Sequence, residues 1–492
     1  MLLIMAGCSA IDQGNDISRA EHTIRVALAQ MPSTTDPRFA TDAISHRIQA
    51  FVHRGLVKMD EHFFAVPDAA ESWQHPNPLL WIFHLRHDLY FHDGSRVTAE
   101  DVAATLQSVM NAALGSPLRA GFAAIESIEV VADDQLKIVL NRADASFLNR
   151  LTVGILSKND SQQRHQSRGL MGCGPYQVSA WEDQMLRLHP VHGDRPDLLW
   201  MMVKDPVTRS LKMVRGEIDF MQNDIPPHLI PYLEKNRDLQ IRDRPSTTFS
   251  YIGMNLQDER LKDRRVRQAL ALGLDRNLLK RALLGDKPIL AETVLIPTHW
   301  AGIEVLHPPF DTARAEALLD EAGFPRQKNG MRFSMIYRTS TNPTRLQMVT
   351  AIADMWGKIG IDVQIQSMEW GGFYARIRRG DFEVYSLDWV AVSDPDIYRW
   401  ILHSTMWPPS GSNRGRYANA AVDGWLDAAA ASDDVMERKQ LYRKVQQQMV
   451  NDWVYIPLWY APVIAVSGPR LREAIVPTAD GSFLPLMQAK LK

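Results

Sequence analysis

The stretch that decides the fold runs from Pro67 to Val102 and reads PDAAESWQHPNPLLWIFHLRHDLYFHDGSRVTAEDV. Residues 81–86 alternate in the way that is typical of a strand with one buried face. Thr98 and Asp101 then form a capping box, which predicts a helix start at that point. Apolar residues at helical spacing continue the pattern and give the predicted helix one buried face, namely Val102, Leu106, Val109 and Met110.

Strand and helix signals extend on both sides of this stretch. The ranges predicted as strands are 23–29, 125–131, 135–140, 177–178, 185–188 and 455–466, and those predicted as helices are 43–52 and 264–274. Gly323, Gly360 and Gly380 each end a further helix and are followed by a strand-like run, at 332–337, 361–366 and 382–389. Helices that alternate with strands indicate an α/β protein. Two glycines beside a proline at 172–176 indicate a crossing between domains.

Length, charge and cysteine content exclude several classes of protein. The chain has 492 residues, which corresponds to roughly three domains at ~150 residues each. With 55 Lys and Arg against 57 Asp and Glu, its net charge of -2 argues against a strongly basic nucleic-acid binder. Only Cys8 and Cys173 are present, so a disulfide framework and a four-cysteine zinc site are excluded.

The amino terminus, MLLIMAGCS, resembles the tail of a bacterial lipoprotein signal in which Cys8 becomes the lipidated residue. Residues 1–22 are then signal and tether. The run lacks a basic segment and is shorter than the usual ~7–15 apolar residues, as expected if the true start lies upstream of Met1. The alternative is a cysteine that is there by chance. No later run reaches the ~18 apolar residues of a membrane span.

Motifs for catalysis and metal binding are missing from the sequence. It contains no GxxxxGK[ST], GxSxG, HExxH or CxxC pattern, which disfavours an enzyme. His84, His87 and His92 fall in one stretch but alternate across a strand and a loop, with no second cluster, so no metal site and no cofactor are expected.

An ordered set of short motifs resembles the family 5 extracellular solute-binding proteins of peptide, glutathione and nickel ABC importers. The set covers about residues 23–466 and consists of the opening stretch, residues 172–176, Met254-Asn255 with 263–270 and Asp275-Arg276, 358–361, 379–382, Trp389 with 394–396, Asn413-Arg414 with Tyr417, and Tyr442 with Val445-Gln446. Each motif is short, and the specificity comes from their order.

The resemblance implies a periplasmic-binding-protein-like type II (cluster C) fold, with two α/β lobes on a two-strand hinge and an extra domain. On that template the first lobe is 23–57, 172–248 and 461–492, the extra domain is 58–171, and the second lobe is 249–460.

The same resemblance implies a monomer in the periplasm or cell envelope, lipid-anchored, that closes on an oligopeptide or peptide-like solute and delivers it to ABC permease subunits. The alternatives are a sensor or chaperone-like binding protein on this fold, or nickel- or haem-type solute binding.

Ligand contacts are expected around Trp389. In dipeptide-binding relatives an Asp follows the Trp by three residues, and the glutathione-type pattern has an Arg there, whereas this chain has Val392. Arg338 is expected in a loop after a strand that ends at Tyr337. The candidate contacts, each with a structural role as the alternative, are Thr35, Asp36, Arg38, Tyr251, Arg338, Trp370, Trp389, Asp394, Trp407, Asn413 and Arg414.

Overall fold

The computed structural model describes residues 22–40, 42–163, 170–223 and 225–492, so Cys8 and the expected signal lie outside the described residues. Its largest sheet has eleven strands in the order β15-β14-β16-β12-β17-β11-β1-β10-β9-β8, with β13 added beside β17. Their bounds are β1 Thr23–Leu28, β8 Tyr176–Glu182, β9 Met185–Pro190, β10 Asp197–Met202, β11 Phe220–Gln222, β12 Gln240–Met254, β13 Ile289–Leu290, β14 Phe333–Ser340, β15 Ile361–Met368, β16 Val384–Trp389 and β17 Tyr455–Ser467.

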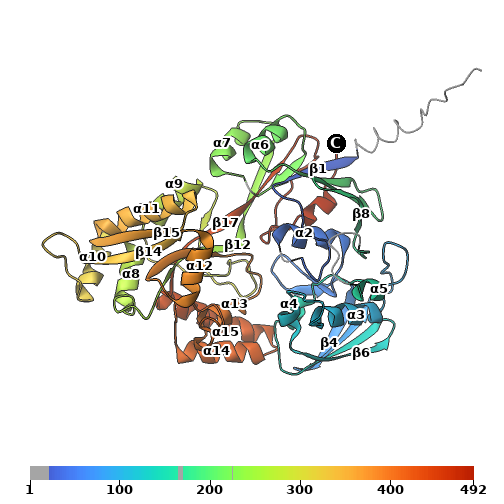
Figure 1. Ribbon diagram of the computed structural model, residues 1–492, viewed down its shortest axis with the longest axis horizontal. Coiled ribbons are helices and arrows are strands. Elements are labelled where there is room, and N and C mark those ends of the chain that lie inside the picture. The colour runs from blue at the N-terminus through green and yellow to red at the C-terminus, as the bar shows by residue number, and fades with distance from the viewer. Residues whose placement is uncertain (1–21, 41, 164–169, 224) are drawn as a thin grey trace, which may run out of the picture.

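Two long antiparallel strands, β12 and β17, belong to both halves of this sheet (Figure 1). Residues 240–245 of β12 pair with 462–467 of β17 in the half that contains β11, β1, β10, β9 and β8. In the other half, residues 249–253 pair with β17 again and residues 249–254 pair with β16. The register shifts between Pro245 and Phe249, where the strands pass from one half to the other. The expected α/β architecture of two lobes joined by two strands is confirmed.

Helices pack through apolar faces on both halves of the large sheet and on a smaller separate sheet. Their bounds are α2 Ala43–Val52, α3 Ala99–Met110, α4 Phe147–Arg150, α5 Lys158–Ser161, α6 Pro206–Val214, α7 Ile230–Glu234, α8 Arg264–Leu272, α9 Arg276–Leu284, α10 Thr312–Glu321, α11 Pro343–Lys358, α12 Trp370–Arg379, α13 Ile397–Leu402, α14 Ala420–Ala431 and α15 Val435–Asn451. Helix α2 shares a core with β1, β8 and β10, in which Phe51 lies edge-on to Tyr176 and Trp200. Helices α8, α10 and α11 share another core with β14 and β15. A second core of the second lobe lies between α12–α15 and strands β12 and β16.

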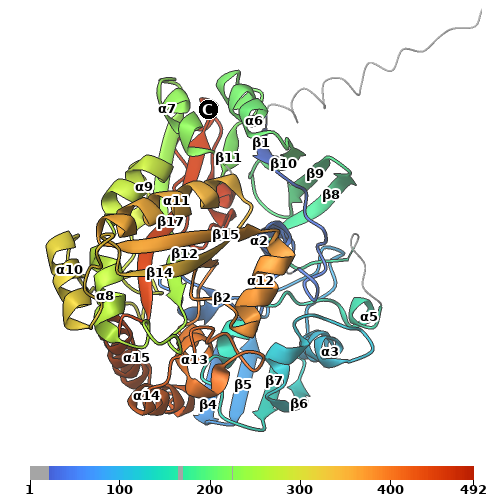
Figure 2. The same cartoon turned by 60° about the vertical axis from the view of Figure 1, so that its left-hand side comes forward.

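A separate antiparallel sheet, ordered β4-β5-β7-β6, forms with α3 the extra unit at the lower right of Figure 1. Its strands are β4 Ala70–Asn77, β5 Leu80–Leu85, β6 Ile125–Ala132 and β7 Gln135–Leu140, and the short pair β2 Val57–Met59 and β3 Ala65–Pro67 precedes it. The capping box is confirmed, because the Asp101 carboxylate accepts a hydrogen bond from the Thr98 backbone N–H at 2.9 Å. Figure 2 shows this sheet below α12 and beside α13 and α14.

The glycines at 172 and 174 are required by close approach of two backbones. A Cβ on Gly172 would lie 1.8 Å from the Val52 carbonyl oxygen, and one on Gly174 would lie 2.4 Å from that of Phe51. The Gly174 N–H donates to the Val52 carbonyl at 2.8 Å. The returning chain therefore passes directly against the carboxyl end of α2.

No helix among the described residues is long and apolar enough to cross a membrane.

Candidate functional site

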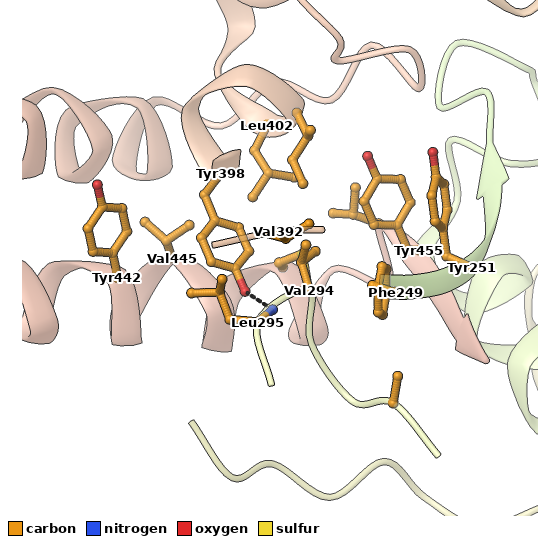
Figure 3. Close-up of a cluster of buried hydrophobic side chains, with 14 of the residues drawn as sticks. Phe249, Tyr251, Val294, Leu295, Val392, Tyr398, Leu402, Tyr442, Val445 and Tyr455 are labelled. Carbon is orange, nitrogen blue, oxygen red and sulfur yellow. Dashed lines mark hydrogen bonds between the residues drawn. The ribbon is translucent and has the colours of Figure 1, made fainter. Parts of the chain in front are cut away.

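An aromatic cluster forms where β12 emerges into the second lobe. Tyr251 on β12 stacks on Trp389 at the end of β16, with ring centroids 5.9 Å apart and planes 7° from parallel. Phe249 stacks on the other side of Tyr251 at 5.6 Å, and Tyr455 of β17 lies 4.5 Å from it. Figure 3 shows Phe249, Tyr251 and Tyr455 side by side at one end of the buried core. The side-by-side strands produce this cluster, because same-face residues of neighbouring strands approach within reach of large rings.

Arg414 lies against this aromatic cluster. Its guanidinium carbon is 4.4 Å from the centroid of the Trp389 ring. Nη1 donates to the Tyr251 hydroxyl at 3.0 Å and Nη2 to the Tyr374 hydroxyl at 3.3 Å. The side chain is only 6% exposed, yet no described carboxylate lies within ion-pair distance of it. A buried cation held only by rings and neutral hydroxyls is incompletely compensated.

Helix α12 carries the cluster toward solvent. Trp370, which is 51% exposed, stacks on Tyr374 at 5.7 Å, and the four-residue spacing places both on one face of the helix. The same spacing leads on to Arg378. A cavity of about 590 Å³ opens beside this part of the helix and is lined by Ala375, Arg378, Arg379, Pro408 and Pro409. That volume lies in the usual range for small-molecule sites.

Trp407 and Asn413 shape the loop that presents Arg414. The Trp407 indole N–H donates to the Tyr417 carbonyl at 3.3 Å. The buried Asn413 amide donates to the carbonyls of Leu402, His403 and Tyr417 at 3.0, 3.1 and 2.8 Å. Asn413 thus fixes the turn, and Arg414 follows it directly.

Arg338 lies in a strand, and the expected loop position is wrong. Strand β14 continues through Ser340 because it pairs with β15 along its whole length. Arg338 donates to Gln366 and, at 2.9 Å, to Asp381, which Arg376 also contacts. Burial opposes ionisation of Asp381, but the hydrogen bond from Arg376 and the charge of Arg338 together lower its pKa. The guanidinium of Arg338 is therefore already paired.

Asp36 and Arg38 satisfy each other in the first lobe. Both side chains are 0% exposed, and Nη2 of Arg38 lies 2.8 Å from the Asp36 carboxylate. Arg38 also donates to the carbonyls of Ser161 and Gln163, at 3.0 and 3.3 Å. Thr35 is buried too, and its carbonyl lies 3.0 Å from Nε2 of His53.

Asp394 contacts the extra unit. Its carboxylate accepts hydrogen bonds from the Ser146 hydroxyl at 3.0 Å and from the Asn149 amide at 2.9 Å, both at α4. Two residues earlier, Val392 is packed in the core of the second lobe (Figure 3). Its N–H donates to the Thr247 carbonyl at 3.0 Å.

The structure brings together Tyr251, Trp389 and Arg414, and joins Trp370 to them through Tyr374. It places Trp407 and Asn413 on the loop that carries Arg414, whereas the contacts described for Thr35, Asp36, Arg38, Arg338 and Asp394 are with other residues. The sequence analysis missed Tyr374, Arg378 and Arg379. The spacing Trp370, Tyr374, Arg378 along one helix was a signal that could have found the first two. No group of three or more potential metal ligands occurs in the described part of the chain.

The chain is similar to several known proteins over most of its length. The family model for bacterial extracellular solute-binding proteins, family 5 Middle, matches residues 65–407. The periplasmic oligopeptide-binding protein OppA of Salmonella typhimurium is 26% identical over 469 residues, covering 86% of this chain and 84% of its own. The oligopeptide-binding protein AppA of Bacillus subtilis, in complex with a nonapeptide, has a TM-score of 0.73 at 23% identity and covers 96% and 99% of the two chains. The unliganded open form of the murein tripeptide binding protein MppA has a TM-score of 0.83 at 22% identity, with 96% and 97% covered.

Proposed function

The chain belongs to the bacterial extracellular solute-binding proteins of family 5, and on that premise we propose that it captures an oligopeptide or peptide-like solute between its two lobes. It is the solute-binding component of an ABC importer and works in the periplasm. Its curated relatives include oligopeptide- and dipeptide-binding proteins, which supports a peptide-like ligand. Proteins of this family bind solutes rather than catalyse reactions, and we propose no chemical step for this chain.

The observation that carries the proposal is the position of the aromatic cluster on β12. Phe249 and Tyr251 come directly after the register shift at which β12 leaves the first lobe. Tyr251 in turn contacts Trp389 and Arg414, and Arg414 reaches Tyr374 of α12, the helix whose Ala375, Arg378 and Arg379 line a cavity of about 590 Å³. A solute held against this aromatic cluster would therefore lie beside the strands that connect the lobes.

Closure of the two lobes would complete the site. Open and closed states of such proteins differ by rotation about a few connecting residues, and a ligand favours the state in which it makes more contacts. Contacts made on both lobes thus shift the population toward closure. Closure also removes water, which strengthens each polar contact to the solute. The closed form is the one that the permease subunits recognise in this proposal.

Thermal unfolding with peptide pools tests the proposal. A ligand present at 100 times its Kd stabilises the native state by about 2.7 kcal/mol. That corresponds to a rise in Tm of roughly 5–11 °C for a cooperative unit of 150–250 residues. Trp389→Ala should abolish the rise, whereas Trp425→Ala, which removes an indole from α14, should keep it. Wild-type protein that shows no rise with any peptide pool would contradict peptide capture.

The lobe boundaries remain part of the proposal. We assign 23–57, 172–248 and 461–492 to the first lobe, 58–171 to the extra domain and 249–460 to the second lobe. The register shift between Pro245 and Phe249 and the close packing at Gly172 support these divisions. Limited proteolysis that cuts preferentially within the second lobe instead of near its ends would argue against them.

Lipid anchoring at Cys8 and a monomeric state complete the proposal. The MLLIMAGCS sequence supports the anchor, which would hold the binding protein near its permease. Sedimentation of the chain beginning at residue 22 should give a species of one chain, since two-lobe closure needs no second copy.

A further inference from the structure

The turn between β2 and β3, residues 60–64, joins the extra unit to the second lobe. The strands on either side of it pack in the core of the extra unit through Val57 and Ala65. Phe63 at the tip of the turn is only 4% exposed, because its ring belongs to the second-lobe core between α12–α15 and strands β12 and β16. It stacks on His299, with ring centroids 5.2 Å apart and planes 16° from parallel. A side chain of the extra unit therefore completes a core of the other lobe.

The backbone of this turn is strained in a way that presents Phe63. Its φ angle of 66° lies in the left-handed region, which bulky residues rarely adopt. Asp60 fixes the turn, because its carboxylate accepts hydrogen bonds from the N–H groups of His62 and Phe64 at 2.8 and 2.9 Å. On the other side, the Trp300 N–H donates to the His62 carbonyl at 3.1 Å. Strain of this kind persists only where the surrounding structure imposes it, and it concentrates at functional sites.

The segment that receives this ring is attached to the strands that connect the lobes. Residues 289–290, which precede the segment, pair with β17. The Tyr460 hydroxyl then donates to the carbonyls of Thr293 and Leu295, at 2.8 and 2.9 Å. Tyr460 itself pairs with Phe249, the first ladder pair after the register shift in β12. The segment is therefore fixed to β17 at the point where that strand passes from one lobe to the other.

A second contact between the extra unit and the second lobe lies beside β12. Asp394, which bonds to α4, follows Val392 by two residues, and the Val392 N–H donates to the Thr247 carbonyl at 3.0 Å. Thr247 lies within the register shift of β12. The extra unit thus meets the second lobe next to both connecting strands. In a hinge rotation the groups near the axis move least, so contacts at this place can persist while the rest of the cleft opens and closes.

We propose that Phe63 is a positioning residue for solute capture, whose insertion forms a third, non-covalent connection between the halves of the molecule in both the open and the closed state. This inference rests on the proposed function, because closure on a solute is the step that it serves. The connection confines the ligand-free protein to a narrow range of lobe openings. A solute that closes the lobes then has less motion to restrict, which strengthens its binding without any contact to Phe63.

Phe63→Asn tests the ring apart from the turn. Asparagine tolerates the left-handed backbone region, so the turn can form while the second lobe loses the ring. Tyr90→Asn is the matched control, because it removes from the extra unit a ring that is 51% exposed. Asp394→Ala, which leaves the Phe63 ring in place, is a second control at the contact between the same two units. Loss of Tm alone does not distinguish a brace from a positioning residue, so the readouts are the distance between the lobes and the affinity.

Spin labels on the two lobes measure the range of openings. Gln184→Cys in the first lobe and Gln347→Cys in the second are exposed positions, and a Cys8→Ser background leaves only the buried Cys173, which the label does not reach. We expect one narrow distribution of label distances for the ligand-free parent and both controls, and a clearly broader one for Phe63→Asn. Calorimetry with tripeptide and tetrapeptide pools should give Phe63→Asn a Kd that is roughly 3- to 10-fold higher, by a similar factor for both pools.

Hydrogen exchange in the wild type tests persistence without any substitution. The Trp300 N–H bonds to the His62 carbonyl, so its exchange rate reports whether the turn stays in place. We expect protection that is equal within about twofold with and without a saturating peptide pool. Protection that is lost when the pool is added would show that the contact breaks on closure, and this would overturn the inference.

The outcomes separate this inference from the function on which it rests. A wild-type distance distribution for Phe63→Asn, or an unchanged Kd, overturns the inference and leaves peptide capture standing. A lower Kd would mean that the contact opposes closure, which overturns the inference as well. If no pool stabilises the wild type, peptide capture fails, and the label distances of the ligand-free protein still decide whether Phe63 confines the lobes.

Discussion

Replacing Arg38 by methionine should destabilise the contact between the first lobe and the extra unit. The change leaves the Asp36 carboxylate, which is 0% exposed, without the guanidinium that contacts it at 2.8 and 2.9 Å. It also removes the donors to the carbonyls of Ser161 and Gln163. Breaking a buried pair by removing one partner costs about 3–5 kcal/mol, because a charge stays buried without compensation. A cooperative unit of 150–250 residues would lose roughly 6–20 °C in Tm.

Urea unfolding followed by tryptophan fluorescence measures the loss. Hydrogen exchange of the backbone amides at 157–163 reports whether the opening is local, since this segment provides the carbonyls that Arg38 contacts. The control is Asp36→Leu/Arg38→Met, which replaces the pair by apolar groups and should recover most of the loss.

The same variants decide between a brace and a ligand contact. We expect the Kd of the stable double variant for the solute to lie within about twofold of the wild-type value, because both side chains are engaged in internal contacts. An Arg38→Met protein within 0.5 kcal/mol of wild type would refute the reasoning from burial. If the double variant is stable but loses affinity for the solute, Asp36 and Arg38 contact the ligand after all.

Three further changes test other parts of the structure. Burial and the neighbouring Asp394 raise the pKa of Asp396 from 3.8 to about 6. Ionisation of Asp396 therefore destabilises the folded state, and this cost is absent below pH 4 and complete above pH 6. Asp396→Asn should therefore gain about 1–3 kcal/mol in urea unfolding at pH 7 and lose that gain at pH 4; an equal effect at both values would disprove the assignment. Asp394→Ala should lower the free energy of unfolding by about 1–3 kcal/mol, because the Ser146 hydroxyl loses its acceptor, and should change the Kd for the solute little. A several-fold loss of affinity would instead make Asp394 a ligand anchor. Cys8→Ser should move the protein from the membrane to the soluble fraction, and persistent sedimentation with membranes would defeat the lipid anchor.

Local signals in the sequence were enough for most elements of the fold. The helix at 43–52, the capping box at Thr98 and the strand pair at 125–140 match the structure because each depends on residues a few positions apart. The end of β14 was misplaced because Thr339 and Ser340 are polar but buried, and their pairing with β15 is set by distant residues.

The candidate site was only partly readable for the same reason. Tyr251, Trp389 and Arg414 could be named one at a time, but their stacking depends on the pairing of β12 with β16. Asp36 and Arg38 were predicted as charged loop residues, and their sequence could not show that each neutralises the other. That no described carboxylate lies within ion-pair distance of Arg414 is visible only once the chain is folded.

The close packing at Gly172 and Gly174 has a consequence for how this fold can vary. The chain leaves the first lobe just after α2 and comes back against the carboxyl end of the same helix, where Gly174 bonds to Val52. Both covalent connections of the intervening segment therefore lie at a single place, and its four strands share no hydrogen-bonded ladder with the large sheet. The intervening segment can therefore change in length, or be exchanged between genes, without altering the path of the chain through the hinge strands β12 and β17, as tolerated insertions generally require.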